Sequence, residues 1–587
     1  MSRIRSAVTA VDRRSFLAAA GAVGLSAGIG VAVGSGGGSG SASAAPAPTA
    51  SGTPAAAGPT PTATPTATPA TPAGPSAART TLHSLATPRD PGAAFRRLGD
   101  GPGWRRVVRE QFASAKSGRE DRRTVLSSFV QLTDLHVTDV QHPVRTEYVR
   151  SESAGAWRPH EALSVPGAVS LIERVNALGT GPATGAPLAF AMTTGDNTDN
   201  NSLCELDWYL TLMSGGLVTP NSGDPRAYEG VQNSGLRMYW HPEDGAPDAD
   251  KRLGYPRIDG FLEAALRPVR SPGLAIPWYS TVGNHDGLAS GAYADRTGFL
   301  AEFAVGARKL YDIPDPDAAT LLARIAEGDT ADGSALIALL RREKRRMRTV
   351  TADPRRAPFT PLQYLTAHLN PANTGAGPVG HGYTRDNLAG ASLDYTFSMG
   401  ADVTGVSLDT TDHGGHFTGS VGTGQLDWLE RILKERRDGY VVLFTHHNSW
   451  TMGNKRPDPA RPGEARHDGD EVVALLRRHR CAVAWVNGHS HRNVVLPHGS
   501  FWEISTASHI DFPQLARVVE IADNKDGTLS LFTTLIESAA PRETDFTDLS
   551  QSGLASLYRE LALNAPGSRQ DLAGLNDARN TELLLRR

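Results

Sequence analysis

The sequence predicts an α/β protein whose sheets are largely buried, and two observations lead to this fold class. Short apolar runs with β character recur along the chain, and patterns with helical periodicity lie between several of them. Runs such as "LAFAMTTGD" and "YVVLFTHH" are apolar along most of their length, which is typical of strands covered on both faces. Hydrophobic residues make up 39% of the chain and charged ones 21%, an ordinary globular balance.

The predicted elements follow one another in a regular order. We expect strands within "SSFVQLTDLHV", "LAFAMTTGD", "AIPWYSTVGNHD", "ADVTGVSLDT", "YVVLFTHH" and "CAVAWVNGHSH". We expect helices within "GAVSLIERVNALG", "GTGQLDWLERILKERR" and "GDEVVALLRRHR". After residue 491 the pattern changes to consecutive strands within "SFWEISTAS", "LARVVEIAD" and "GTLSLFTTLI", which predict a β-rich closing layer.

The first 85 residues differ in composition from the rest. Arg13 and Arg14 precede an apolar stretch from Phe16 to Val33, and "SASAAP" offers an A-x-A cleavage site. Residues 1–44 therefore resemble a twin-arginine signal peptide; the alternative is a membrane anchor that stays attached. Residues 45–85 are rich in Ala, Pro and Thr and are expected to form a disordered linker.

Export by the twin-arginine machinery would place the mature chain outside the cell or on the cell wall, and we expect no transmembrane segment in it. The folded domain is expected over residues 90–545, followed by a C-terminal helical tail over 546–587. Residues 201–275 and 287–400 are predicted to be long irregular insertions that frame the active site. Within the second insertion, the run 320–350 is expected to be helical.

Charge and cysteine content exclude some classes of protein. The net charge of −3 argues against specific nucleic-acid binding, which normally requires a basic excess. The chain has two cysteines, Cys204 and Cys481, too few for a thiolate zinc site or a disulfide scaffold. Both flank apolar runs, so we expect buried free thiols, although one bridge between them remains an alternative.

Residues typical of metal sites follow five of the predicted strands. In chain order they occur in "TDLHV", "GDNTDN", "GNHD", "THH" and "GHSH". Asp134 and His136 are at positions i and i+2, so on a strand they would share one side. Because ligands of open α/β sheets bind at the carboxyl ends of the strands, we expect these side chains to converge.

Taken together, the motifs resemble the signature of the calcineurin-like metallophosphoesterase superfamily, which runs D-x-H, G-D-x-x-D/N, G-N-H-D/E, H and G-H-x-H. The resemblance covers residues 125–540, with the two insertions unaccounted for. It implies a four-layer α-β-β-α sandwich with long loop insertions. It also implies an exported phosphomonoesterase or phosphodiesterase acting on a small or surface-bound phosphate ester.

The resemblance further implies two metal sites that share one carboxylate. The first would be formed by Asp134, His136, Asp196 and His491, and the second by Asp196, Asn284, His446 and His489. Carboxylate, imidazole and amide ligands suit two divalent or trivalent ions such as Mn, Fe or Zn. A hydroxide bridging the two ions would attack phosphorus in line. His285 would protonate the leaving group, and Asp199 would hold the His285 imidazole in the required tautomer.

Some readings stay open at this stage. His447 adjoins a ligand, yet core packing is at least as plausible for it. His413 and His416 lie in a glycine-rich loop that either overhangs the metals or is an ordinary surface loop. Asp286 is expected to be a structural acid rather than a catalytic one. The alternative function is a catalytically inactive binding module of the same fold, and the complete set of seven expected ligands argues against it.

Overall fold

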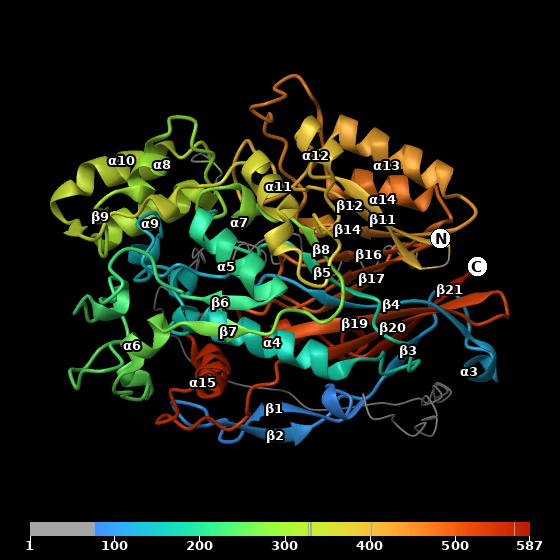
Figure 1. Cartoon of the computed structure of the whole chain (residues 1–587), viewed down its shortest axis with the longest axis horizontal. Helices are drawn as coiled ribbons and strands as arrows, with labels where there is room; N and C mark the ends of the chain where they lie inside the picture. Colours follow the sequence, from blue (N-terminus) through green and yellow to red (C-terminus); the bar gives the residue numbers. More distant parts are fainter. Residues whose placement is uncertain (1–76, 327, 329–330, 401, 569) are drawn as a thin grey trace, which may run out of the picture.

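Two β-sheets packed face to face form the centre of the molecule (Figure 1). The structure, a computed structural model, describes residues 77–587 except 327, 329–330, 401 and 569. The predicted signal peptide at 1–44 and the linker up to residue 76 lie outside the described residues. Both therefore stay predictions.

The first sheet has seven strands in the order β3-β21-β20-β19-β4-β5-β8. Strands β4, β5 and β8 are parallel, whereas β19 pairs antiparallel with both β4 and β20. The bounds are β3 Val107–Arg109, β4 Thr124–Leu132, β5 Phe190–Thr194, β8 Trp278–Thr281, β19 Leu515–Asp523, β20 Thr528–Glu537 and β21 Thr581–Arg586.

The second sheet has six strands in the order β11-β12-β14-β16-β18-β17. Strands β12, β14, β16 and β18 are parallel, so their carboxyl ends lie at one edge of the sheet. The bounds are β11 Tyr395–Gly400, β12 Val403–Ser407, β14 Tyr440–Phe444, β16 Ala482–Asn487, β17 Val494–Pro497 and β18 Trp502–Ser505.

Apolar side chains fill the space between the two sheets. Phe129 on β4 stacks on Phe190 at a ring-centroid distance of 5.0 Å and meets Phe444 of the other sheet edge-on at 5.6 Å. Both inner faces are thus buried, which explains why the strand sequences are apolar almost throughout.

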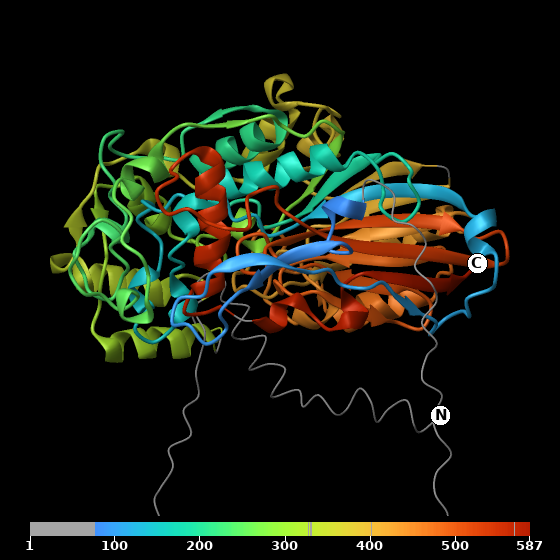
Figure 2. The ribbon, with the colours of Figure 1, turned by 90° about the horizontal axis from the view of Figure 1, so that it is seen from below.

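Helices cover the outer faces of both sheets. Helices α4 (Ser164–Leu178) and α5 (Leu203–Ser214) share a buried cluster with the seven-stranded sheet. Helices α13 (Thr423–Glu435) and α14 (Gly469–Arg477) share another with the six-stranded sheet, and they lie together over β12 and β14 in Figure 1. The predicted four-layer α-β-β-α sandwich is therefore confirmed, and Figure 2 shows its long strands running through one half of the molecule.

The sequence of α14 shows why these segments become helices against the sheet. Asp468 caps the helix by accepting from the Glu471 amide at 3.1 Å, while Glu471 accepts from the Asp468 amide at 2.9 Å. Val472, Leu475 and Leu476 follow at helical spacing and are buried.

The predicted irregular character of the two insertions is wrong, although the helix expected over residues 320–350 is present as two shorter helices. The first, 201–275, contains α5, β6 (Gly216–Val218), α6 (Phe261–Leu266) and β7 (Val269–Ser271). The second, 287–400, contains α8 (Phe299–Val305), α9 (Asp315–Ala326), α10 (Ser334–Arg342), α11 (Pro361–Leu369), α12 (Arg385–Gly390) and β11. Helices α8, α9 and α10 have their own buried cluster, because short apolar stripes suffice when the elements pack on one another.

The predicted boundaries also need correction at both ends. Strand β1 (Ser84–Pro88) pairs with β2 (Leu98–Pro102), and the Thr81 hydroxyl donates to the Leu535 carbonyl at 2.9 Å. Folded structure therefore begins within the predicted linker. At the other end, 546–587 is not wholly helical, because α15 (Gln551–Asn564) is followed by β21, which pairs with β20.

The remaining regular elements are short. They are the helices α3 (Arg119–Arg122) and α7 (Asn284–Gly287) and the strands β9 (Arg308–Lys309), β10 (Arg348–Thr349), β13 (Val421–Gly422) and β15 (Arg466–His467), besides several 3-10 turns.

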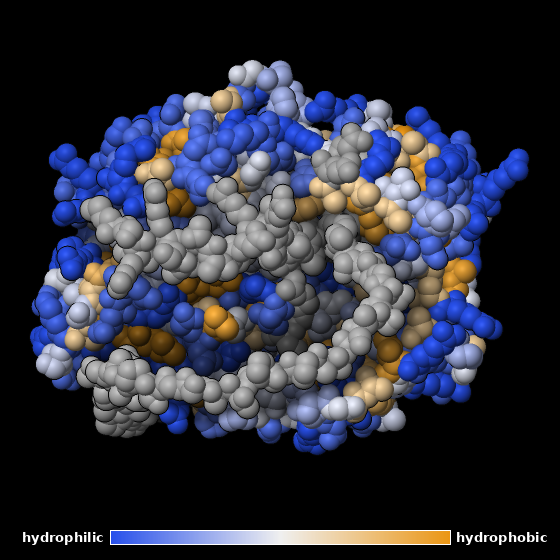
Figure 3. Space-filling view, turned by 180° about the vertical axis from the view of Figure 1, so that it is seen from behind, coloured by the Kyte–Doolittle hydropathy of each residue, from blue (hydrophilic) through white to orange (hydrophobic). Residues whose placement is uncertain are grey.

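Both cysteines are free and buried, as predicted. Within the described part of the chain, no helix combines the length and the apolar character needed to cross a bilayer. Where the described residues are visible in Figure 3, hydrophilic residues predominate, with small hydrophobic areas between them.

Candidate metal centre

All nine residues singled out for metal binding or catalysis come together in one buried cluster. They follow strands β4, β5, β8, β14 and β16, whose carboxyl ends meet where the two sheets face each other. Asp199 is 7% exposed, and every other member of the set is at most 2% exposed.

The backbone places five of these side chains through left-handed conformations. The residues are Asp134, His136, Asp196, His489 and His491, with φ between 44° and 60°. β4 ends at Leu132, so the prediction that Asp134 and His136 extend from a strand is wrong. They lie in a loop instead, held because their amides donate to the carbonyls of Gly195 and Asp196 at 3.1 and 3.0 Å. Such conformations typically cost on the order of 1–3 kcal/mol each and concentrate at functional sites.

Two glycines of the motifs allow the loops to approach this closely. A Cβ on Gly283 would lie 2.3 Å from Asp196 Oδ1, and a Cβ on Gly488 would lie 2.0 Å from Thr133 Oγ1 and 2.5 Å from Asp134 Oδ2. Side chains at either position would push the proposed ligands apart, which is the physical reason for glycine in "GNHD" and "GHSH".

The first ligand set consists of three facing acceptor atoms. The Nε2 atoms of His136 and His491 and the Oδ1 atom of Asp134 are buried, and among the described residues none of the three has a hydrogen-bond partner. His491 Nε2 lies 3.3 Å from Asp134 Oδ1, and His136 Nε2 lies 3.6 Å from Asp196 Oδ2.

The outer nitrogens of the same two imidazoles are engaged by carboxylates. His136 Nδ1 is 2.9 Å from Asp199 Oδ1, and His491 Nδ1 is 2.6 Å from Asp511 Oδ2. Each carboxylate accepts a hydrogen bond from the Nδ1–H group, which leaves the Nε2 lone pair directed at the centre. Buried hydrogen-bond acceptors that face one another are unfavourable unless a cation lies between them. These three atoms are therefore suited to bind a metal ion.

The second ligand set is equally compact. His446 Nε2 lies 3.0 Å from Asn284 Oδ1 and 3.2 Å from Asp196 Oδ2, while His489 Nδ1 lies 3.1 Å from both His446 Nε2 and Asn284 Oδ1. Oxygen and nitrogen ligands at about 2.0–2.2 Å from one ion are separated by about 3 Å, so these spacings fit one cation. Asp196 approaches both sets, as a bridging ligand must.

The negative charge of the carboxylates in the cluster also favours bound cations. Burial disfavours a charged imidazole, yet Asp196 raises the pKa of His446 to about 9, and Asp134 and Asp511 raise that of His491 to about 9. The carboxylates therefore attract positive charge to the positions where the two sets converge.

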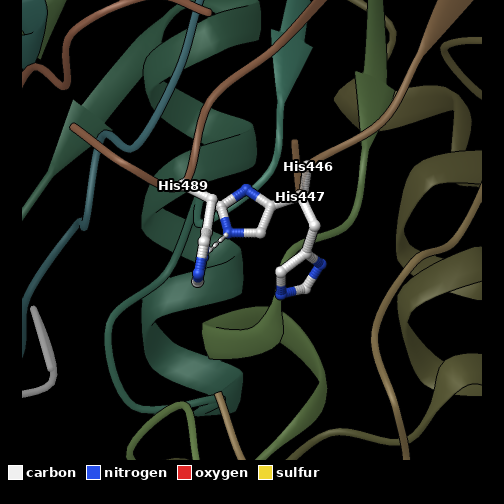
Figure 4. Close-up of side chains that lie close together, drawn as sticks. All are labelled: His446, His447 and His489. Carbon is white, nitrogen blue, oxygen red and sulfur yellow. Dashed lines mark hydrogen bonds between the residues drawn. The ribbon is translucent and has the colours of Figure 1, made fainter. Parts of the chain in front are cut away.

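His447 has a structural environment. Its Nδ1 is 2.9 Å from the Thr410 hydroxyl, and its Nε2 is 3.1 Å from the Phe417 carbonyl. Figure 4 shows the hydrogen bond between His446 and His489, which does not include the His447 ring. Both nitrogens of His447 are thus engaged by the protein, which favours the core-packing reading.

Asp199 positions two histidines in different ways. The sequence-based expectation was that it holds the His285 imidazole, and it does so through its main-chain carbonyl, which lies 2.6 Å from His285 Nδ1. Its carboxylate binds His136 and Arg145 instead. Although burial opposes ionisation, Arg145 and His136 hold the pKa of Asp199 well below its usual value.

Asp286 supports the backbone, as expected for a structural acid. Its carboxylate accepts from the amides of Gly283 at 2.9 Å, Asn197 at 3.2 Å and Thr198 at 2.9 Å. It thereby ties the loop after β5 to the turn that carries Asn284 and His285.

Sequence reasoning missed four supporting residues. Asp511 binds His491 and forms a two-point ion pair with Arg158, at 2.6 and 3.1 Å. Arg145 stands behind Asp199, and its guanidinium donates to Glu161 at 2.6 Å. Glu161 also accepts from the Arg158 amide at 3.3 Å, which links the two histidine supports. Asp511 follows β18, so the strand-end rule would have found it; no spacing pattern marks the other three.

Comparison with known proteins shows similarity to a curated relative over a short part of the chain. No family model matches the chain. A curated relative, a manganese-dependent ADP-ribose/CDP-alcohol diphosphatase from Xenopus tropicalis, is 31% identical over 77 residues, which is 13% of this chain and 21% of the relative. The chain therefore matches about a fifth of that protein's length.

Solved structures resemble the chain only distantly. A dimetal phosphatase from Danio rerio has a TM-score of 0.34 and 12% identity, covering 71% of this chain and 100% of that one. A putative 5′-nucleotidase from Staphylococcus aureus has a TM-score of 0.26 and 12% identity, covering 73% and 57%. A purple acid phosphatase from Lupinus luteus has a TM-score of 0.26 and 9% identity, covering 74% and 54%. Interpretation of the site therefore rests on its own geometry.

The role of Asp511 can be tested by metal affinity. Asp511→Ala removes the carboxylate that accepts a hydrogen bond from His491 Nδ1. The affinity for one of the two metal ions is therefore expected to fall by about 10–100-fold. Asp511→Asn retains an acceptor oxygen and is expected to have a smaller effect. Competition with a chromophoric chelator measures both.

The matched control is Asp100→Ala, which removes an exposed carboxylate paired with Arg542. Equal affinities of wild type and Asp511→Ala for both metal ions would show that Asp511 does not support His491 as a metal ligand.

Proposed function

We propose that this chain is a two-metal phosphoesterase of the calcineurin-like metallophosphoesterase type. The observation that carries the proposal is the convergence of three unpartnered buried acceptors, Asp134 Oδ1, His136 Nε2 and His491 Nε2, beside the second compact ligand set. Seven ligand positions in the order of the superfamily's motifs support it. The complete set also argues against the alternative of an inactive binding module.

The two sets define which residues hold which ion. Asp134, His136 and His491 would hold one, Asn284, His446 and His489 the other, and Asp196 would bridge. Bound ions of this kind neutralise charge on phosphoryl oxygens and make a water molecule nucleophilic near neutral pH. Manganese is a reasonable first ion to test, since the Xenopus tropicalis relative is described as manganese-dependent.

His285 is the group placed to move a proton. Its Nδ1 is held at the Asp199 carbonyl, and its buried Nε2 has no partner among the described residues. Because the ring orientation is fixed from Nδ1, Nε2 is the atom that would carry a proton to a leaving oxygen. The neighbouring Asn284 side chain is fixed as well, since its carboxamide nitrogen Nδ2 donates to the Gly291 carbonyl at 2.9 Å.

The proposed substrates are phosphate esters, either monoesters or diesters. Because the name of the curated relative refers to diphosphates of nucleosides and alcohols, diphosphate esters belong among the compounds to be tested.

We also propose that the chain is exported by the twin-arginine machinery, on the basis of Arg13, Arg14 and the apolar stretch behind them. Replacing both arginines by lysine is expected to retain the protein inside the cell, as judged by fractionation. Unchanged export of the double variant would contradict this assignment.

Hydrolysis itself is tested on protein stripped of metal and reloaded separately with Mn, Fe, Zn or Mg. We expect turnover of p-nitrophenyl phosphate or bis-p-nitrophenyl phosphate with at least one ion, and the ratio of the two rates distinguishes monoesterase from diesterase. Asp196→Asn is expected to abolish turnover because it weakens the bridging ligand of both sets. Metal retention without turnover in wild type would favour the binding module.

The role of His285 is tested by leaving groups of different basicity. General acid catalysis typically contributes about 10²–10⁴-fold. His285→Ala is therefore expected to lower kcat strongly for phenyl phosphate and much less for p-nitrophenyl phosphate, whose leaving group needs no proton. An equal loss for both esters would contradict proton transfer by His285.

A further inference from the structure

A pocket of about 340 Å³ lies next to α7, the turn that carries Asn284 and His285 and is called the catalytic turn below. The phosphoryl chemistry described above does not use this pocket. Its wall includes Asn200, which follows Asp199, and Gly287, which follows Asp286. The rest of the wall comes from the segment after this turn, from the loop after β4 and from the loops carrying His413 and Pro459. The pocket shares Asn200 with a smaller hollow that is lined by Asp199 and His285.

The walls of this pocket are mainly apolar. Its apolar lining includes Val144, Leu288, Ala289, Tyr293, Leu300 and Ala304, and its polar lining includes His142, Asn200, Asn201, Asp295, Arg296 and His413. A volume of a few hundred Å³ with such a lining is typical of sites for small organic molecules. A phosphate group is small and strongly hydrated, so the pocket suits a different part of the substrate.

The proton-donating face of His285 is directed toward the segment that forms this wall. A Cβ built on Gly291 would lie 2.3 Å from His285 Nε2, and Gly291 is between Ala289 and Tyr293 of the lining. The Nε2 atom of His285 thus lies against the segment that carries Ala289 and Tyr293, close to the wall of the pocket.

His413 is one of the residues that line the pocket. Its Cε1 lies 3.4 Å from the position of a Cβ on Gly287, and its Nε2 pairs with Asp409 Oδ2 at 3.1 Å. The His413 loop therefore lies against the catalytic turn, and the two alternatives that the sequence left for His413 and His416 stay open.

We infer that this pocket receives the organic group esterified to the phosphate, and that this group is apolar or aromatic and at least one ring in size. The inference rests on the proposed function and narrows its substrate class. Short polar alcohols such as glycerol leave the apolar wall unused, so their phosphate esters gain nothing from it.

The test compares 2-naphthyl phosphate with glycerol 3-phosphate in the metal-loaded enzyme. Ala301→Trp places a large ring at the pocket from the half-buried side of α8. We expect kcat/KM for 2-naphthyl phosphate to fall by about 10-fold or more, within the range that apolar pockets discriminate, while kcat/KM for glycerol 3-phosphate stays within about 2-fold. Pro459→Trp, which fills the pocket from the opposite loop, is expected to act in the same direction.

Glu302→Trp is the matched control, because Glu302 is the next residue of α8, is exposed and is not part of the lining. A second readout is the affinity for 2-naphthylmethylphosphonate, measured by calorimetry; it is expected to fall in Ala301→Trp and not in Glu302→Trp.

The outcomes separate the two proposals. If wild type hydrolyses no phosphate ester with any metal, the proposed function fails. If wild type is active but both pocket variants affect the two esters equally, or affect neither, the pocket does not hold the ester group and the inference is overturned.

Discussion

The concentration of electron-rich atoms around Asp196 is the constraint on which the rest of this structure depends. Asp196 Oδ2 lies 3.2 Å from His446 Nε2 and 3.6 Å from His136 Nε2, all in nearly complete burial. Carboxylates and imidazole lone pairs repel one another in a low-dielectric interior unless positive charge lies between them. Two cations remove this repulsion, so folding and metal binding are expected to be coupled.

The fold supplies the geometry that this cluster needs. Parallel strands from two sheets end at one edge of the sandwich, so loops that are distant in sequence meet there. The left-handed backbone at five ligand residues stores strain that the surrounding hydrogen bonds hold in place. Carboxylates behind His136 and His491 fix both rings, and two arginines joined through Glu161 fix the carboxylates.

Much of this arrangement is predictable from the sequence, because strand-end residues are marked by local patterns. The apolar runs before Asp134, Asp196, Asn284, His446 and His489 predict the strands, and the resemblance of the motifs to the superfamily signature implies the two ligand sets. The conformation of Asp134 and His136 is not predictable in this way, since an i, i+2 pair is compatible with a strand and with the observed loop. Periodicity predicts a helix over residues 320–350, where α10 lies, but it does not predict the other short helices of the insertions, some of which pack on one another.

Supporting residues were harder to predict because their roles depend on tertiary contacts. Arg145 and Arg158 lie in the loop between β4 and α4, where nothing in the spacing distinguishes them from surface arginines. Likewise, β21 joins the sheet by pairing with β20. The sequence of this short segment does not predict that long-range pairing.

The most direct test of the two-metal interpretation is anomalous X-ray diffraction from crystals of the purified protein equilibrated with Mn²⁺. Our account predicts two anomalous peaks per chain about 3.5–4 Å apart, one on each side of the Asp196 carboxylate. One peak lies among Asp134, His136 and His491, and the other among Asn284, His446 and His489. A single peak, or none within reach of Asp196, would contradict the account.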